Sequence, residues 1–227
     1  ACLLLATLTF IHCVSRQTSG KFQQTFTALK VALILIFCFI IFFWGSSPQN
    51  ISLAPKLGDE NILFSGVFAI SLIYVNYAYT GWNAVTYVIS ELDEPQRNLP
   101  IVLLVGTLLV MLIYLLLNFT FLNAVPIKII EGELEIGVIV ANYALGDHAG
   151  KAMGAILAVL LVSTVSAMTM AGPRVLQVIG EDFKPFRSLS RVNSRGIPTI
   201  AIMFQSSLAF LFIISSTFES VLVFSSF

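Results

Sequence analysis

The chain has 227 residues, of which 57% are hydrophobic and only 11% are charged, and its mean hydropathy is +0.93. Soluble domains carry about 25% charged residues. The composition therefore excludes a soluble domain and predicts an all-α polytopic membrane protein, whose helices satisfy their own backbone polar groups inside lipid. The 12 basic and 12 acidic residues cancel, so the net charge gives no indication of a nucleic-acid partner.

Apolar stretches follow one another along the chain at roughly the length of a membrane span, about 20 residues. From the N-terminus, we expect spans at about residues 1–13 (partial), 22–44, 62–90, 100–122, 149–176, 198–216 and 220–227 (partial). Together they predict a single transmembrane domain over residues 1–227. Both ends of the sequence lie inside apolar runs, which favours an internal fragment of a longer protein.

Lys and Arg are unequally shared between the two sides of this arrangement. Eight lie in or beside the loops at residues 14–21, 91–99 and 177–197, against three on the opposite side. The positive-inside rule therefore predicts that these loops are cytoplasmic. We expect a multi-pass protein of the cell membrane, with the lipid bilayer as its surroundings.

Residues 77–83, YAYTGWN, interrupt the charge-free span at 62–90. Gly81 permits backbone angles that break a helix, and we expect a break at 79–83. Non-helical backbone at membrane depth is tolerated where protein or a water-filled cavity satisfies it, and in secondary transporters such breaks form the substrate site. The alternative is a continuous helix with a packing glycine, which is frequent in membranes. The candidate substrate-binding residues are Tyr77, Ala78, Tyr79, Thr80, Gly81, Trp82 and Asn83.

These residue types suit a small amphiphilic ligand. A half-helix beginning near Asn83 would present a positive dipole end to an anion such as a carboxylate. Tyr77, Tyr79 and Trp82 would supply flat apolar walls, and Asn83 a directional polar contact.

Lys30 is the one basic residue embedded in a predicted span, within FTALKVALILIFCFIIFFW. An intramembrane charge is a functional candidate and should face the interior of the helix bundle. The alternative is a side chain that extends toward the cytoplasmic interface. A buried ammonium group could replace a bound cation, or it could lose its proton when desolvated.

Polar side chains also gather in the span at 149–176, where Ser163 and Ser166 share one helical face with Thr164 beside them. Such hydroxyls can line a polar cavity, but they also hydrogen-bond the backbone or a neighbouring helix. His12, near the end of the first span, is expected at the membrane interface.

The sequence contains no nucleophile–base pair, metal-ligand cluster or phosphate-binding loop, so we expect neither an enzyme nor a cofactor or metal site. The three cysteines, Cys2, Cys13 and Cys38, lie in apolar stretches and are expected to act as small hydrophobic residues. None lies in a predicted outer loop, so the sequence indicates no external attachment point for a disulfide-linked accessory subunit.

Several segments resemble the amino-acid permeases of the amino acid–polyamine–organocation superfamily, and most closely the L-type amino-acid transporters and their bacterial homologues. FAISLIYVNYAYTGWNAVTYVISELDEPQRNLP resembles the sixth-helix region of that family, and FTALKVALILIF its fifth helix. STVSAMTMAGPRVLQVIGED resembles the eighth helix, and NSRGIPTIAI the start of the ninth.

The resemblance implies a fold of two inverted repeats of five helices, of which this chain would run from the end of the fourth helix into the tenth. It implies substrate binding between the broken first and sixth helices, the latter matching Tyr77 to Asn83. Lys30 matches a lysine that takes the place of a sodium ion, facing the region of Ser163, Thr164 and Ser166. The first helix would lie upstream of these residues.

We therefore expect amino-acid transport by alternating access, either as sodium-independent exchange or as proton-coupled symport. One alternative is a polyamine or organic-cation carrier, which a competition panel would separate. Another is a truncated, non-transporting membrane paralogue or scaffold. The sequence leaves the amino acid, the coupling ion and the need for an accessory subunit open.

Overall fold

The computed structural model describes residues 1–45, 49, 51, 54 and 58–215, and within these ranges it is helical with no strand. This confirms the all-α prediction. The chain divides into two compact units. Unit 1 comprises Ala1–Leu33 and Ala155–Phe227, and unit 2 comprises Ile34–Gly154.

Three helices in the described part of the chain are long and apolar enough to cross a membrane: α2 (Arg16–Trp44), α5 (Pro95–Ala124) and α8 (Asp147–Asp182). Their most apolar windows have mean hydropathies of 2.7, 2.8 and 2.0. Since a bilayer core accommodates about 20 helical residues, the lengths and composition of these helices are those of a membrane protein.

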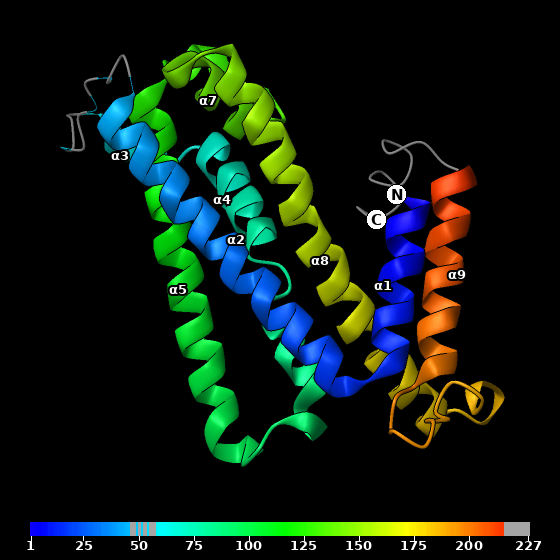
Figure 1. Cartoon of the computed structure of the whole chain (residues 1–227). Helices are drawn as coiled ribbons and strands as arrows, with labels where there is room; N and C mark the ends of the chain where they lie inside the picture. Colours follow the sequence, from blue (N-terminus) through cyan, green and yellow to red (C-terminus); the bar gives the residue numbers. More distant parts are fainter. Residues whose placement is uncertain (46–48, 50, 52–53, 55–57, 216–227) are drawn as a thin grey trace. The chain divides into compact units, whose positions relative to one another are not determined.

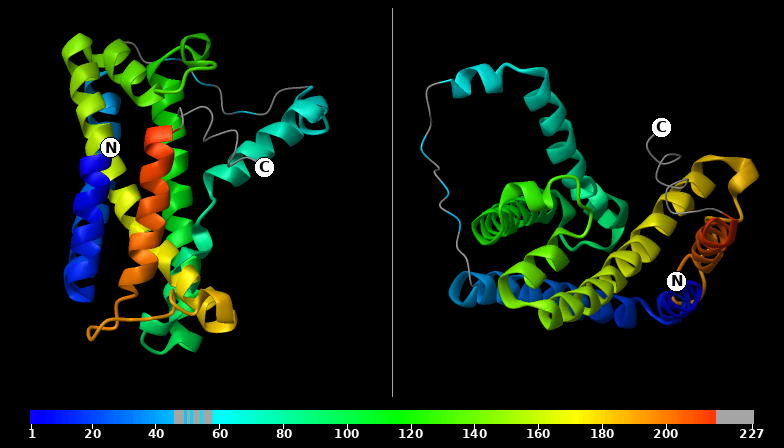
Figure 2. Two further views of the ribbon diagram at one scale, coloured as in Figure 1. Left: turned by 90° about the vertical axis from the view of Figure 1, so that its right-hand side faces the viewer. Right: turned by 90° about the horizontal axis from the view of Figure 1, so that it is seen from above.

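Unit 1 contains α1 (Cys2–Val14), the first half of α2, most of α8, the short 3₁₀ helix η2 (Lys184–Phe186) and α9 (Thr199–Ser215). Helices α1 and α9 pack side by side (Figures 1 and 2). Between them, the hydroxyl oxygens of Thr9 and Ser206 lie 2.7 Å apart.

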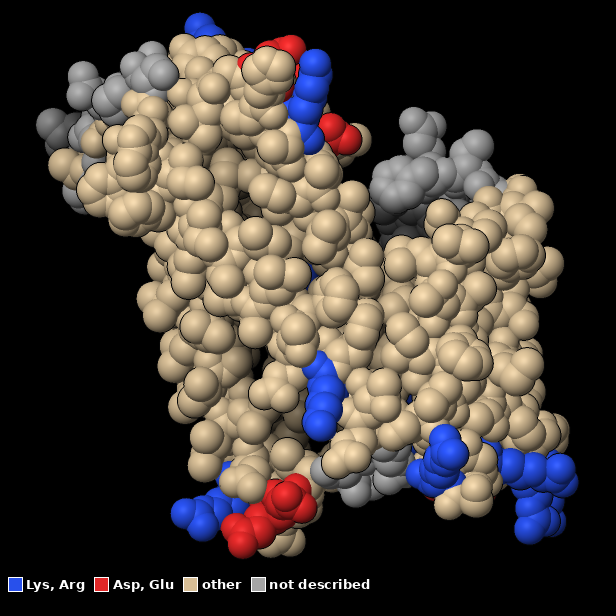
Figure 3. Space-filling view, viewed as in Figure 1, with Lys and Arg blue, Asp and Glu red and all other residues tan. Residues whose placement is uncertain are grey.

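Basic side chains gather over the segment that connects α8 with α9, whereas the visible surfaces of α1 and α9 carry no charged residue (Figure 3). The Asn193 side chain orders the end of this segment by accepting hydrogen bonds from the backbone N–H groups of Arg195 and Ile197, at 2.9 and 3.0 Å. The Arg195 guanidinium donates to the Val14 carbonyl at the end of α1. The basic segment is thus fixed to the helix pair.

Unit 2 contains the end of α2, α3 (Asp59–Leu63), α4 (Gly66–Ala78), the 3₁₀ helix η1 (Trp82–Glu91), α5, α6 (Ile127–Ile130), α7 (Ile136–Leu145) and the start of α8. Its core lies where the end of α2 meets the end of α5 and the two helices that follow. The buried side chains of this core are Ile41, Ala124, Val125, Ile130, Val140 and Ala144. Packing of α5 against α7 and against η1 builds the rest of the unit.

Several helices extend beyond the apolar segments that predicted them. Helix α2 begins at Arg16, so most of the expected loop at 14–21 is helical. Helix α5 begins at Pro95, which suits the first turn because its missing N–H would be unpaired there anyway, and this shortens the expected loop at 91–99. Helix α8 continues to Asp182 through the start of the expected loop at 177–197. Hydropathy marks only the apolar part of a helix, while its polar ends can continue outside the membrane.

The predicted span at 62–90 is divided among three helical segments. Helix α3 ends at Leu63 and α4 begins after Ser65, whose side chain accepts a hydrogen bond from the Phe68 N–H at 3.2 Å. Helix α4 ends at Ala78 and η1 begins at Trp82. The predicted segment at 220–227 lies outside the described residues. All three cysteines are free thiols, with Cys38 buried and Cys2 and Cys13 half-buried.

Candidate substrate site

The interval between α4 and η1 is built from tight backbone turns. The N–H groups of Tyr79, Thr80 and Trp82 donate to carbonyls three residues earlier, at 3.0, 3.0 and 3.3 Å. Gly81 has φ of 97°, in the region that L-residues rarely adopt. A glycine at this position therefore lets the chain leave the α-helix and restart as the 3₁₀ helix η1. The interval, residues 79–81, lies inside the stretch 79–83 where the sequence predicts a break.

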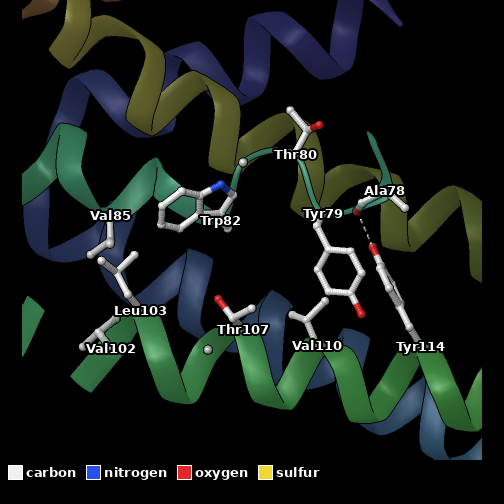
Figure 4. A pocket seen from close by; sticks show the side chains of 12 residues that line it. Ala78, Tyr79, Thr80, Trp82, Val85, Val102, Leu103, Thr107, Val110 and Tyr114 are labelled. Carbon is white, nitrogen blue, oxygen red and sulfur yellow. Dashed lines mark hydrogen bonds between the residues drawn. The ribbon is translucent and has the colours of Figure 1, made fainter. Parts of the chain in front are cut away.

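A cavity of about 380 Å³ lies between this interval and α5 (Figure 4). In the view of Figure 4, the Tyr79 ring extends toward α5, whereas the Thr80 side chain points away from it. The wall is mostly apolar, with the Thr107 hydroxyl among its polar groups. The lining residues are Ala78, Tyr79, Thr80, Gly81, Trp82 and Val85 on one side and Val102, Leu103, Gly106, Thr107, Val110 and Tyr114 on α5.

The structure brings five of the seven predicted binding residues, Ala78 to Trp82, to this cavity. Tyr77 and Asn83 are not among its lining residues. The Tyr77 side chain is exposed, and Asn83 Nδ2 donates to the Tyr87 hydroxyl one turn further along η1, at 3.3 Å. Trp82 contributes to the cavity wall and remains 62% exposed, so one part of the ring is open to another molecule.

The second group of predicted residues lies in unit 1. Lys30 Nζ on α2 donates to Thr164 Oγ1 on α8 at 3.0 Å. The ion pairs of the described residues join Arg97 with Glu94 and Lys151 with Asp147, so Lys30 has a hydroxyl partner there and no carboxylate. The Thr164 hydroxyl on α8 is thus a neutral hydrogen-bond partner for the Lys30 side chain.

Ser163 and Ser166 are buried, with 1% and 0% of their surface exposed. Ser166 Oγ lies 3.0 Å from His12 Nε2, and one of the two atoms donates the proton. His12 itself is only 3% exposed, so it lies buried among helices near the end of α1, while its expected depth at the membrane interface stays a prediction. The reason is packing: α1 lies against its neighbours along its length, so a polar residue near its end becomes buried when a hydroxyl on α8 pairs with it.

Sequence reasoning missed the α5 side of the cavity. Val102, Gly106, Val110 and Tyr114 recur at every fourth position and so share one face of α5. Gly106 and Tyr114 are the one glycine and the one tyrosine of that helix. Gly106 and Tyr114 lie eight positions apart, which places them on the same face of the helix, and this spacing could have identified the face. The apolar residues around them show no helical periodicity that would do so.

Comparison with known proteins identifies the family of the chain. The model of the amino acid permease family matches residues 1–227. The b(0,+)-type amino acid transporter 1 of Homo sapiens is 28% identical over 239 residues, covering 100% of this chain and 47% of that protein. The Mus musculus protein of the same name is 25% identical over 226 residues, covering 97% of this chain and 45% of that protein.

A second kind of relative matches more closely over a shorter stretch. The large neutral amino acids transporter small subunit 2 of Mus musculus is 32% identical over 155 residues, covering 64% of this chain and 27% of that protein. The chain spans about half the length of the first relatives named here. Because the family model covers the chain from end to end, this protein belongs to the amino acid permease family.

Proposed function

We propose that the protein carrying this chain transports amino acids across the membrane by alternating access. The observation that carries the proposal is the interrupted helix α4–η1, with Gly81 at a positive φ and a cavity beside it. Irregular backbone at membrane depth is tolerated where it lines a cavity. The relatives are named amino acid transporters, which favours an amino acid over other small solutes.

Tyr77 to Asn83 contact the substrate in this proposal. The positive end of the η1 dipole attracts the substrate carboxylate in this proposal. The N–H groups of Trp82 and Ala84 themselves donate to the carbonyls of Tyr79 and Gly81, at 3.3 and 2.9 Å. The exposed face of Trp82 packs against the apolar part of the substrate. The resemblance implies that the remaining contacts come from a second broken helix upstream.

Lys30 acts as a fixed cation in this proposal. Its hydrogen bond to Thr164 links α2 with α8, and the resemblance implies that this lysine takes the place of a sodium ion. We therefore propose sodium-independent transport, as exchange or as proton-coupled symport. Ser163 and Ser166 belong to the same stretch of α8 and hold its polar face against its neighbours.

The proposal includes a location in the cell membrane, with residues 14–21, 91–99 and 177–197 on the cytoplasmic side. The basic segment between α8 and α9 supports this orientation (Figure 3). The name of one relative describes it as a small subunit. Purification of the full-length protein from its native membrane tests whether an accessory subunit accompanies it.

Uptake of labelled amino acids into vesicles containing the full-length protein tests the proposal. We expect saturable uptake that does not require sodium, and that is stimulated either by a preloaded amino acid (exchange) or by an inward proton gradient (symport). Lys30→Ala should lower uptake at least tenfold, because a hydrogen bond to a charged group contributes about 1.5–3 kcal/mol. Trp82→Ala should raise the KM by roughly three- to tenfold, because a packed aromatic ring is worth about 0.5–1.5 kcal/mol beyond its area.

Two substitutions of the same residue types serve as controls. Lys128→Ala and Trp44→Ala remove exposed side chains and should leave uptake unchanged. Undiminished uptake in both Lys30→Ala and Trp82→Ala would overturn the site assignment. Inhibition by putrescine and not by neutral amino acids would assign a polyamine or organic-cation carrier. The absence of any uptake would favour a non-transporting paralogue or scaffold.

A further inference from the structure

The end of α4 has a partner on α5 that the proposed binding residues do not include. The Tyr114 hydroxyl donates to the Ala78 carbonyl at 2.9 Å (Figure 4). The last four carbonyls of a helix have no partner within it. Tyr114 therefore satisfies one of these orphan acceptors at the residue where α4 ends.

The same side chain also contacts the residue that follows. The rings of Tyr114 and Tyr79 lie edge to face, with centroids 5.2 Å apart and planes at 67°. Edge-to-face pairs are favourable because the positive edge of one ring meets the negative face of the other. The hydroxyl of Tyr114 thus fixes the backbone of Ala78, and its ring fixes the side chain of Tyr79.

The rest of the interval has little side-chain packing. A Cβ added at Gly81 would meet nothing within 4 Å, and the Tyr77 and Trp82 side chains are exposed. The interval is therefore open on the side of the glycine and attached to α5 at its beginning. Its conformation is held by its own backbone hydrogen bonds, by the packing of η1 on α5 and, at its beginning, by the Tyr114 side chain.

We propose that Tyr114 is a positioning residue of the substrate site, which holds the end of α4 and the ring of Tyr79 so that residues 79–83 are presented in their binding conformation. This inference rests on the proposed transport function. Tyr114 acts through Ala78 and Tyr79, and its role requires no contact with the substrate. It also makes α5 and the interrupted segment move together, because one side chain joins the two.

The expected kinetic signature follows from the population of the binding conformation. When only a fraction of molecules is competent to bind, the apparent dissociation constant rises by the inverse of that fraction. Removal of one neutral hydrogen bond changes such an equilibrium by roughly three- to tenfold. Loss of the Tyr114 hydroxyl should therefore raise the KM by about this factor and leave the maximal rate per molecule unchanged.

The test compares three variants of the full-length protein in vesicle uptake, with rates divided by the amount of protein in the membrane. Tyr114→Phe removes the hydroxyl and retains the ring, so it should raise the KM by roughly three- to tenfold. Tyr114→Leu removes both contacts and should raise the KM further. Tyr74→Phe removes a hydroxyl from an exposed tyrosine on α4 and should match the wild type.

A second measurement needs no substrate. Hydrogen exchange of the purified full-length protein should show faster exchange at the amides of residues 79–84 in Tyr114→Phe than in Tyr74→Phe. If the wild type transports and Tyr114→Phe has an unchanged KM, the inference is overturned while the proposed function stands. Equal exchange at residues 79–84 in the two variants overturns it as well. If the wild type transports nothing yet Tyr114→Phe exchanges faster, the proposed function fails and the positioning contact remains.

Discussion

Unit 1 and unit 2 hold their polar groups in different ways. In unit 1, His12 and Ser166 are almost wholly shielded from solvent and pair with each other across two helices. In unit 2, the interval after α4 has exposed side chains at Tyr77 and Trp82 and an open glycine between them. Unit 1 buries this polar contact inside helix packing, whereas unit 2 attaches a short non-helical segment to α5.

The difference predicts different consequences of substitution. Removing one partner of a buried hydrogen bond leaves the other group desolvated and unpaired, which costs about 1–3 kcal/mol. Changes in an open segment leave no buried group behind, so they alter the conformation of the segment more than the stability of the fold. Substitutions of the buried pair His12 and Ser166 should therefore lower stability, and substitutions at the interval should lower substrate affinity.

The chain has two histidines, one in each unit, and the largest loss of stability is expected from substitution of the one in unit 1, His12. His12→Ala removes a buried ring and leaves the Ser166 hydroxyl without its partner. The lost hydrogen bond and the new cavity together should lower the free energy of unfolding by about 2–4 kcal/mol. Denaturation of the purified full-length protein in mixed micelles measures this change.

His148→Ala is the matched control, because His148 is exposed at the start of α8. It should change stability by less than about 0.5 kcal/mol, as surface substitutions usually do. Equal denaturation curves for the two variants would contradict the comparison between the units. A smaller loss in His12→Asn than in His12→Ala would assign part of the effect to the hydrogen bond with Ser166.

A pair of helical glycines gives the next largest contrast. A Cβ at Gly172 in unit 1 would overlap the Gln205 side-chain amide, whose Nε2 donates to the Met168 carbonyl at 3.1 Å. A Cβ at Gly106 in unit 2 would meet nothing within 4 Å. The Gln205 amide is the end of a flexible side chain and can move aside, but it then loses its hydrogen bond to Met168. Gly172→Ala should therefore destabilise the protein by about 0.5–1.5 kcal/mol. Gly106→Ala should be neutral or stabilise it by up to about 1 kcal/mol, because alanine favours the helix.

The same denaturation experiment checks both variants. Gly172→Ala should cost less in a Gln205→Ala background than in the wild type, since the smaller side chain leaves no overlap. A Gly172→Ala protein as stable as Gly106→Ala would mean that α8 and α9 do not pack as tightly as the structure indicates.

Much of the fold could be predicted from the sequence because each membrane helix is marked by a local run of apolar residues. The expected spans mark only the apolar parts of α2, α5 and α8, because a helix can continue as a polar segment beyond the membrane, where hydropathy no longer marks it. Gly81 pointed to the interruption because its effect on the backbone is also local.

The partners of the site residues were harder to predict because they are distant in the sequence. His12 and Ser166 are 154 positions apart, and nothing near His12 indicates that a hydroxyl will lie against it. Tyr114 lies on a helix where nearly every neighbouring residue is apolar, so periodicity could not show which face meets the interval. Lys30 was more informative, because an isolated charge within a span favours the interior.

The smallest effect on stability is expected at Gly81, where the comparison can be made sharpest. Gly81→Ala places a side chain at φ of 97° and should strain the backbone by about 1 kcal/mol. Because the position is open, the segment can relax, and the free energy of unfolding should fall by less than that amount. The strain should appear instead as a roughly threefold higher KM for uptake, since fewer molecules hold the binding conformation.

Gly66→Ala is the control, because Gly66 lies at the start of α4 with open space around it. It should neither lower the free energy of unfolding nor raise the KM. If Gly81→Ala destabilises the protein as much as Gly172→Ala and leaves the KM unchanged, the interval supports the fold rather than the ligand, and the distinction between the two units fails.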